Sequence, residues 1–361
     1  MRPTRAVISL AAIEHNLAAI RAMAPSSKIM AVVKADAYGH GIVPVAKSLS
    51  AADALAVACI EEAIELRAGG ITDDIILLEG FFEADEIQLI QEYQLQTVIH
   101  HQHQVDQLIA ADLSQPIIVW LKLDTHMNRL GFDEQTFHSA YQAVKQIEHV
   151  SEIRLMTHFA CADDITDDKT DRQLTLFKHT IEQISESRTA ANSAGVLAWP
   201  ETHFEWVRPG LMLYGCSPLP GNCGADHKLM PSMTLESKVI AVKDIAQGES
   251  VGYGAKWLAQ ENTRIAIIAI GYGDGYPRHI KNGGPVWLND RIVPIAGRVS
   301  MDMIAVEVGL DSNDNVGDRV VLWGPELPVE KVAEAADTIP YTLLCAVTSR
   351  VKFHWVDSSI E

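Results

Sequence analysis

The sequence predicts a (β/α)8 barrel of the TIM type followed by a C-terminal, mostly β domain. Seven or eight strand–helix units follow one another over about the first 230 residues, which is the rhythm of an α/β chain. After Pro231, strands are separated by short turns and helical periodicity is scarce. The 361 residues are enough for both units. An open doubly wound sheet is the alternative for the first unit.

The expected strands of the first unit are short apolar runs. The first covers residues 5–9, and apolar residues at helical spacing follow it from Leu10 to Ile20, with Pro25 just past the end. Further strands are expected at 29–33, 54–58, 75–78, 97–99, 117–123, 153–158, 189–193 and about 210–214. Helices are expected at 43–49 and 61–67.

We place the domain boundary after residue 230, so that 1–230 form the barrel domain and 231–361 the β domain. Turns rich in glycine and asparagine separate the strands of the second domain up to about Trp323, and a helix is expected at 329–336. The first strand, about 3–9, is a candidate to pair with this second domain.

Composition limits the possible functions. The formal net charge of −18 argues against nucleic acid and anionic membranes as partners. The N-terminal segment lacks the apolar stretch of an export signal, and no run approaches the length of a membrane span. The five cysteines are scattered and none forms a CxxC pair, which is typical of reduced thiols. We therefore expect a cytoplasmic protein with neither a membrane nor a nucleic-acid partner.

The segment 32–41, VVKADAYGHG, carries the most informative chemistry. Lys34 follows an apolar strand, and desolvation lowers the pKa of a lysine at such a position. A neutral amine can attack a carbonyl and form a Schiff base. Tyr38 and the glycines after it offer a hydroxyl and close backbone approach, which suit a phosphate group. A strand-end lysine whose charge reaches water is the alternative, and this segment alone does not decide between the two.

Eight motifs occur in one order along the chain, namely VVKADAYGHG, KLDTHMNRLGF, THFACAD, ANSAG, VRPGLMLYG, VGYGAKW, GYGDGYPR and GRVSMDM. Together they resemble the alanine racemase family, pyridoxal-phosphate (PLP) enzymes with a barrel domain and a C-terminal β domain. The resemblance implies interconversion of L- and D-alanine, for peptidoglycan or alanine catabolism. It also implies a homodimer with each site built from the barrel of one subunit and the β domain of the other.

The resemblance assigns the catalytic and cofactor-binding roles. Lys34 would hold PLP and act as one base, with Tyr253 as the second, because racemisation exchanges protons on both faces of the substrate Cα. Arg208 would face the pyridine nitrogen and leave it unprotonated, since arginine keeps its own proton. His158 would pack against the pyridine ring and link Tyr253 to Arg208. The residues that would hold the phosphate are Tyr38, Ser193, Gly210 and Leu211.

Further roles implied by the resemblance concern the substrate. Arg129 would bind the alanine carboxylate, Met301 would add a backbone contact to it, and Tyr272 would line the entrance. Lys122 matches a lysine that is often carbamylated, which converts it to an anion that orients the arginine. The alternative is an ordinary strand lysine paired with an acid such as Asp124.

Two positions depart from the family pattern. His126 stands where the family usually has the glycine of KxDTG, so a positive φ there would be strained. Ser349 precedes Arg350, where some members carry a tyrosine that reaches the phosphate. Serine is too short for the same contact.

Three rival functions make different demands on the chain. A barrel-type decarboxylase of basic amino acids would need an acidic residue where Arg208 stands. A non-catalytic PLP carrier would consist of the barrel alone, against the β domain that follows residue 230. A periplasmic racemase of broad specificity would need an export signal. The sequence is compatible with a biosynthetic or a catabolic role. It is also compatible with substrates such as serine or larger amino acids.

Other motifs have simpler explanations. We expect no metal at His100, His101 and His103, because no cysteine or acidic partner completes a site there. The glycine-rich stretch 271–275 is not followed by a helix, so it does not predict a dinucleotide loop. The aspartates of 163–171 are expected to form the exposed start and face of a helix.

Overall fold

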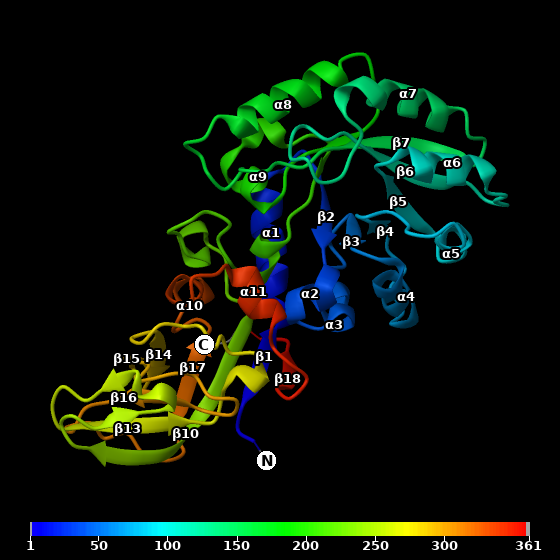
Figure 1. The fold of residues 1–361 in the computed structure, drawn as a ribbon. Helices are drawn as coiled ribbons and strands as arrows, with labels where there is room; N and C mark the ends of the chain where they lie inside the picture. The colour runs from blue at the N-terminus through cyan, green and yellow to red at the C-terminus, as the bar shows by residue number, and fades with distance from the viewer. Residues whose placement is uncertain (1, 359–361) are drawn as a thin grey trace.

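The structure is a computed structural model that describes residues 2–358. A closed parallel barrel and a mostly β domain form the two parts of the molecule, as the sequence predicts (Figure 1). The barrel strands follow chain order around the barrel and are β2 (Lys28–Val32), β3 (Ala54–Val57), β4 (Ile75–Leu77), β5 (Leu95–Ile99), β6 (Ile117–Lys122), β7 (Val150–Met156), β8 (Arg188–Thr189) and β9 (Trp206–Val207).

Helices connect the strands and surround the barrel. The first, α1, begins after Ser9, whose hydroxyl accepts from the Ala12 N–H at 3.0 Å, and it buries Ile13, Leu17 and Ile20 at helical spacing. The others are α3 (Ile42–Ser48), α4 (Ile60–Ala68), α5 (Glu86–Glu92), α6 (Gln102–Ala110), α7 (Glu134–Lys145), α8 (Lys169–Thr180) and α9 (Ser193–Ala198), while α1 spans Leu10–Met23. Every residue of β3 and β4 is buried, as expected of parallel strands covered on both faces.

Two of the predicted barrel strands are wrong in position. The region 210–214 forms a 3-10 helix, η2 (Leu211–Tyr214), and the last barrel strand is β9 instead. Pro209 follows Arg208 and offers no N–H to continue a strand ladder. The strand expected at 189–193 stops at Thr189, because Asn192 caps α9 by accepting from the Gly195 N–H at 2.9 Å.

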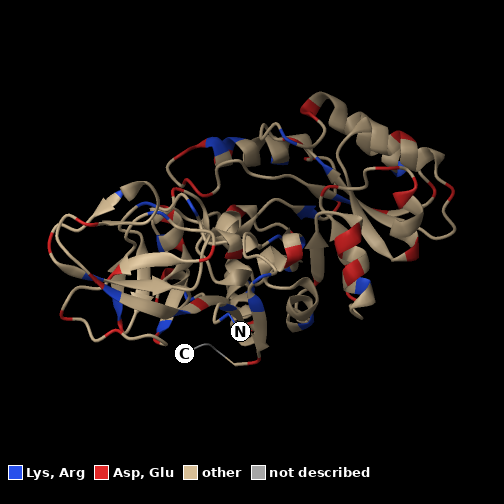
Figure 2. Cartoon of the chain, turned by 60° about the horizontal axis from the view of Figure 1, so that its bottom comes forward, with Lys and Arg blue, Asp and Glu red and all other residues tan. Residues whose placement is uncertain are grey.

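The expectation for the aspartate-rich segment is also only partly met. Helix α8 begins at Lys169, with Asp168 at its N-cap position, so Asp171 lies in the first turn while the earlier aspartates precede the helix. Figure 2 shows that the acidic residues are spread over helices and loops. None of the helices within residues 2–358 is long and apolar enough to cross a bilayer.

The turn after Lys34 has an unusual backbone. In α2 (Lys34–Gly39), the residues Ala35, Asp36, Ala37 and Tyr38 have φ of 55°, 52°, 51° and 52°, which is the left-handed helical region. Each such residue costs about 1–2 kcal/mol in an L-amino-acid chain, so the turn persists only because its surroundings fix it. Asp36 Oδ1 accepts from the Ile42 N–H at 2.7 Å and contributes to this fixation.

The second domain is built on the long strand β10 (Met233–Ile245). Its sheet has the order β15-β14-β17-β10-β1-β18, with β13 and β16 added through β10. Strand β1 pairs antiparallel with β10 and parallel with β18. The first strand therefore belongs to the sheet of the second domain, as considered from the sequence. The bounds are β1 (Arg5–Ser9), β13 (Thr263–Ile268), β14 (Pro285–Leu288), β15 (Arg291–Pro294), β16 (Ile304–Glu307), β17 (Arg319–Trp323) and β18 (Lys352–Val356).

Short elements complete the chain. The two-stranded hairpin joins β11 (Ser250–Val251) to β12 (Trp257–Leu258). Two helices of the second domain are α10 (Val329–Ala335), at the predicted place, and α11 (Pro340–Cys345), which the sequence analysis did not predict. The remaining 3-10 turns are η1 (Pro200–Thr202), η3 (Gly224–His227), η4 (Tyr253–Ala255) and η5 (Tyr272–Asp274).

Candidate active site

A cavity of about 580 Å³ lies where the barrel strands end. Active sites of this fold are built at the C-terminal face, from the residues that follow the strands. Most of the predicted site residues line this cavity, namely Lys34, Tyr38, Lys122, Arg129, His158, Ser193, Arg208, Gly210 and Leu211. They come from five strand ends and the loops behind them, so the closure of the barrel brings them together.

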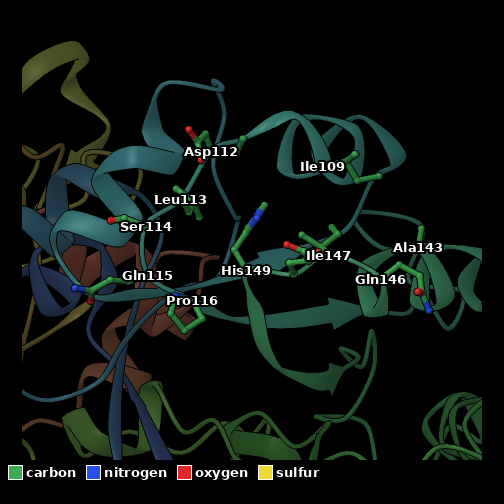
Figure 3. A pocket seen from close by; sticks show the side chains of 12 residues that line it. Ile109, Asp112, Leu113, Ser114, Gln115, Pro116, Ala143, Gln146, Ile147 and His149 are labelled. Carbon is green, nitrogen blue, oxygen red and sulfur yellow. The ribbon is translucent and has the colours of Figure 1, made fainter.

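A larger hollow, of about 770 Å³, lies at the opposite end of the barrel, where β6 and β7 begin (Figure 3). Residues such as Asp112, Gln115 and His149 line it. It contains no lysine or arginine and none of the predicted site residues. We therefore identify the candidate active site as the cavity at the C-terminal face, because of the residues that line it and not because of its volume.

Arg208 is a buried guanidinium that forms no ion pair with a carboxylate among the described residues. Nη1 donates to Thr189 Oγ1 at 2.7 Å, and Nη2 donates to the carbonyl oxygens of Thr157 at 2.8 Å and Ala190 at 3.2 Å. Burial lowers the pKa of Arg208 to about 9, which still leaves a cation at neutral pH. These contacts use the two Nη atoms and leave Nε without an acceptor in the part of the chain that the structure describes.

His158 is held as a neutral imidazole. Its Nδ1 lies 3.1 Å from Arg208 Nη2, and since a guanidinium only donates, Nδ1 accepts. Burial, followed by the charges of Arg208 and Lys122, lowers the pKa of His158 well below its ordinary value. The ring therefore carries its single proton on Nε2.

The cavity is strongly cationic. Its lining contains the side chains of Lys34, Lys122, Arg129 and Arg208 against the single carboxylate of Glu79. Burial, and then the charges of Arg208 and Arg129, lower the pKa of Lys122 to about 8. In a chain with a net charge of −18, such a concentration of cations favours an anionic ligand.

One wall of the cavity offers hydrogen-bond donors to an anion. Ser193 Oγ accepts from the N–H groups of Gly210 at 2.9 Å and Met212 at 3.3 Å, so its own proton is left to donate. The Gly210 N–H, which we expected to contact the phosphate, therefore supports Ser193 instead. Burial raises the pKa of Tyr38, whose hydroxyl therefore keeps its proton. A Cβ at Gly210 would lie 2.5 Å from that hydroxyl, so any other residue there would displace the Tyr38 ring. Leu211 opens η2, and its N–H has no acceptor within that helix.

Tyr341 lines the same cavity, although the sequence analysis did not single it out. Its ring centroid lies 5.6 Å from that of Tyr38. Ser349, which we considered as the shortened counterpart of a phosphate-binding tyrosine, does not line the cavity. Pro340 starts α11 and places Tyr341 at the barrel. A proline followed by a tyrosine near the C-terminus was the available signal for this helix.

The loop that carries Arg129 has a strained backbone and is held near its start by Asp124. His126 has φ of 72° and Asn128 has φ of 57°, so the positive φ considered for His126 is present. Asp124 Oδ1 accepts from the N–H groups of Met127 at 2.9 Å and Asn128 at 3.1 Å. Arg129 itself forms no ion pair within residues 2–358, so its guanidinium is left for a ligand.

Three predicted site residues lie outside the cavity of their own chain. Tyr253, Tyr272 and Met301 belong to the second domain, where they are 68%, 37% and 51% exposed. The Tyr272 N–H donates to the Ser300 carbonyl at 3.0 Å, which keeps Tyr272 next to Met301. A single chain therefore brings the barrel residues together and leaves these three side chains on the surface.

The fold and the cavity define a class of protein. The chain joins a closed barrel to a β domain and carries a lysine and a buried arginine in a cavity at the C-terminal face of the barrel, which is the arrangement of a two-domain barrel enzyme. Family models identify both parts, with the alanine racemase N-terminal domain matching residues 8–218 and the C-terminal domain matching residues 232–355. The chain belongs to the alanine racemase family, as its motifs predicted, and is an amino-acid racemase, an isomerase.

Relatives cover nearly the whole chain. The alanine racemases of Shewanella piezotolerans and Shewanella denitrificans are 50% and 49% identical over 97% of this chain, and 99% and 98% of their own lengths are covered. The crystal structure of the biosynthetic alanine racemase from Pseudomonas aeruginosa has a TM-score of 0.96 and 44% identity over 99% of this chain and 100% of that one. The alanine racemase structure from Acinetobacter baumannii has a TM-score of 0.95 and 39% identity at the same coverage. Enzymes of this family depend on PLP.

Proposed function

We propose that this protein interconverts L-alanine and D-alanine with PLP bound in the cavity at the C-terminal face. The observation that carries the proposal is Arg208, which lines the same cavity as Lys34 and is buried without a carboxylate partner within residues 2–358. A barrel-type decarboxylase of basic amino acids would require a carboxylate at that position. The chain would work in the cytoplasm and supply D-alanine for peptidoglycan or take part in alanine catabolism.

The cavity residues fit PLP. Lys34 offers an amine for the aldehyde, and Arg208 Nε is the donor left over for the pyridine nitrogen. The phosphate would be held by the hydroxyls and N–H groups of one wall, from Tyr38, Ser193, Leu211 and Tyr341. When bound, PLP supplies an electron sink that stabilises negative charge on the substrate Cα.

Two bases then exchange the Cα proton. Lys34 is the first, and it lies in the barrel. We propose Tyr253 of the partner subunit as the second, because the 68% exposed ring belongs to the β domain and lies outside the cavity of its own chain. The active form is therefore a homodimer with shared sites. In the same arrangement, Tyr272 of the β domain would line the entrance to the site, and Met301 would contact the substrate carboxylate through its backbone.

Arg129 would bind the alanine carboxylate, and Lys122 would modify the charge around it. A pKa of about 8 leaves roughly a tenth of the Lys122 amine neutral at pH 7. The neutral form can react with carbon dioxide to give a carbamate, which exchanges a cation for an anion. This exchange would relieve the repulsion among the four cationic side chains of the cavity.

A chiral assay of the PLP-loaded protein tests the function. L-Alanine should be converted to an equal mixture of isomers, and L-serine and L-lysine measure the width of specificity. Lys34→Ala should lose this activity and should no longer retain PLP covalently after borohydride reduction. Absence of D-alanine with the wild-type enzyme would overturn the proposal, and covalent retention by the variant would remove Lys34 from its role.

A further inference from the structure

Gln173 bridges two segments that reach the cavity. It lies in α8 and is 2% exposed. Its Nε2 donates to Thr125 Oγ1 at 3.1 Å and to the His158 carbonyl at 3.1 Å, while its Oε1 accepts from the Ala160 N–H at 2.9 Å. The carbonyl and the N–H fix the orientation of the amide, because each can bond only one of its two ends.

The bridge continues to the support of Arg208. Thr125 Oγ1 and Thr157 Oγ1 are 2.8 Å apart, and both threonines are completely buried. The Thr157 carbonyl accepts from Arg208 Nη2 at 2.8 Å. A buried chain of polar side chains therefore leads from Gln173 on α8 to Thr125, and from Thr125 to Thr157 at the end of β7.

The two segments that Gln173 joins, the end of β7 and the Arg129 loop, differ in how many other contacts hold them. His158 is bonded to Arg208 as well as to Gln173. The loop beyond Thr125 is exposed at His126, Asn128 and Arg129, and it has a strained backbone. Loss of the Gln173 amide should therefore release the loop more than the strand end.

We propose that Gln173 is a positioning residue that holds the Arg129 loop in place for the substrate carboxylate. This inference rests on the proposed function, in which Arg129 binds that carboxylate. The hydrogen bonds between an arginine and a carboxylate depend on where the guanidinium lies. A shift of about 1 Å in such a group can lower the catalytic rate by up to about 10²-fold. Gln173 does not line the cavity and acts through Thr125.

The test replaces Gln173 by leucine, which keeps the bulk and removes the amide. With the PLP-loaded dimer, Gln173→Leu should raise KM for L-alanine roughly tenfold, with a smaller change in kcat. Propionate has the carboxylate and methyl of alanine without the amine, and its inhibition constant should rise by the same factor. A purely structural role would lower the melting temperature or the active fraction and leave both constants unchanged.

Thr170→Val is the matched control. Thr170 lies one turn earlier on the same helix, is completely buried, and its hydroxyl has no partner in the described part of the chain. Its removal should leave KM and the propionate constant unchanged. If Gln173→Leu does not fold, Thr125→Val removes the same link at its other end and should give the same rise in KM.

Arg129→Ala distinguishes a failure of the positioning role of Gln173 from a failure of the carboxylate role of Arg129. If it raises KM and the propionate constant while Gln173→Leu, or Thr125→Val in its place, leaves both unchanged, the positioning role is overturned and the proposed function stands. If Arg129→Ala changes neither constant, the carboxylate role of Arg129 fails, and the inference fails with it. In the double variant, Gln173→Leu should add nothing to the effect of Arg129→Ala, since it acts only through that side chain.

Discussion

Nη2 of Arg208 lies 3.1 Å from Nδ1 of His158, and this contact determines which proton the histidine can offer. The buried guanidinium donates to Nδ1, so the imidazole presents an N–H on Nε2 toward its other side. An N–H donor backed by a buried cation stabilises an anion placed against it. In the proposed dimer that anion is the phenolate of Tyr253 of the partner subunit, the form in which the tyrosine acts as a base.

Replacement of His158 by phenylalanine tests this relay. The ring remains, but the Nε2–H is lost, so the phenolate of the catalytic tyrosine loses the donor that stabilises it. A base is active only above its pKa, so the acid limb of the pH–rate profile should move to higher pH, with a loss of about 10²-fold or more at pH 7. The exposed His103 on α6 is a control, and His103→Phe should leave the profile unchanged. An unshifted limb in His158→Phe would contradict the relay.

A second prediction concerns the charge of Lys122. If the side chain is a carbamate, mass spectrometry under gentle conditions should detect the added carboxyl group. Lys122→Ala should lose activity, because Arg129 is then no longer oriented by an anion, and small carboxylates should partly restore it. Full activity of the alanine variant would argue against any role of the modified lysine.

His40 provides a pH-dependent contribution to stability. It is fully buried, and burial lowers its pKa to about 4 from an ordinary value of 6.5. The unfolded chain therefore binds a proton first as the pH falls, and the folded state is destabilised below pH 6.5. From pH 7 to pH 4 this group should reduce the free energy of unfolding by about 3 kcal/mol.

Denaturant unfolding at several pH values measures this contribution. His40→Gln cannot titrate, so the free energy of unfolding of the variant should depend less steeply on pH by the same amount. Equal slopes for the wild type and the variant would show that His40 is not the source. The wild-type change alone does not suffice, because His158 also has a lowered pKa and adds to the same trend.

The sequence predicted the barrel, the β domain and the family because each depends on regular signals. Apolar runs at intervals of one strand–helix unit indicate a closed barrel, and the motifs around Lys34 and Arg208 lie at strand ends. What it could not predict depends on tertiary contacts. The left-handed turn after Lys34 contradicts the local preference of alanine and tyrosine, and Tyr341 reaches the cavity only because α11 packs against α2.

The shared site gives the last prediction, which joins the mechanism to the assembly. Lys34→Ala and Tyr253→Phe should each be nearly inactive, because each removes one of the two bases, with a loss on the order of 10² to 10⁴-fold. When the two variants are unfolded, mixed and refolded together, a hybrid dimer has one site with both lesions and one with neither. Random pairing makes half of the dimers hybrids, so activity should return to about a quarter of wild type. If both bases came from one chain, every site would carry a lesion. No recovery in verified hybrids would therefore reject the shared site and leave the two-base chemistry open.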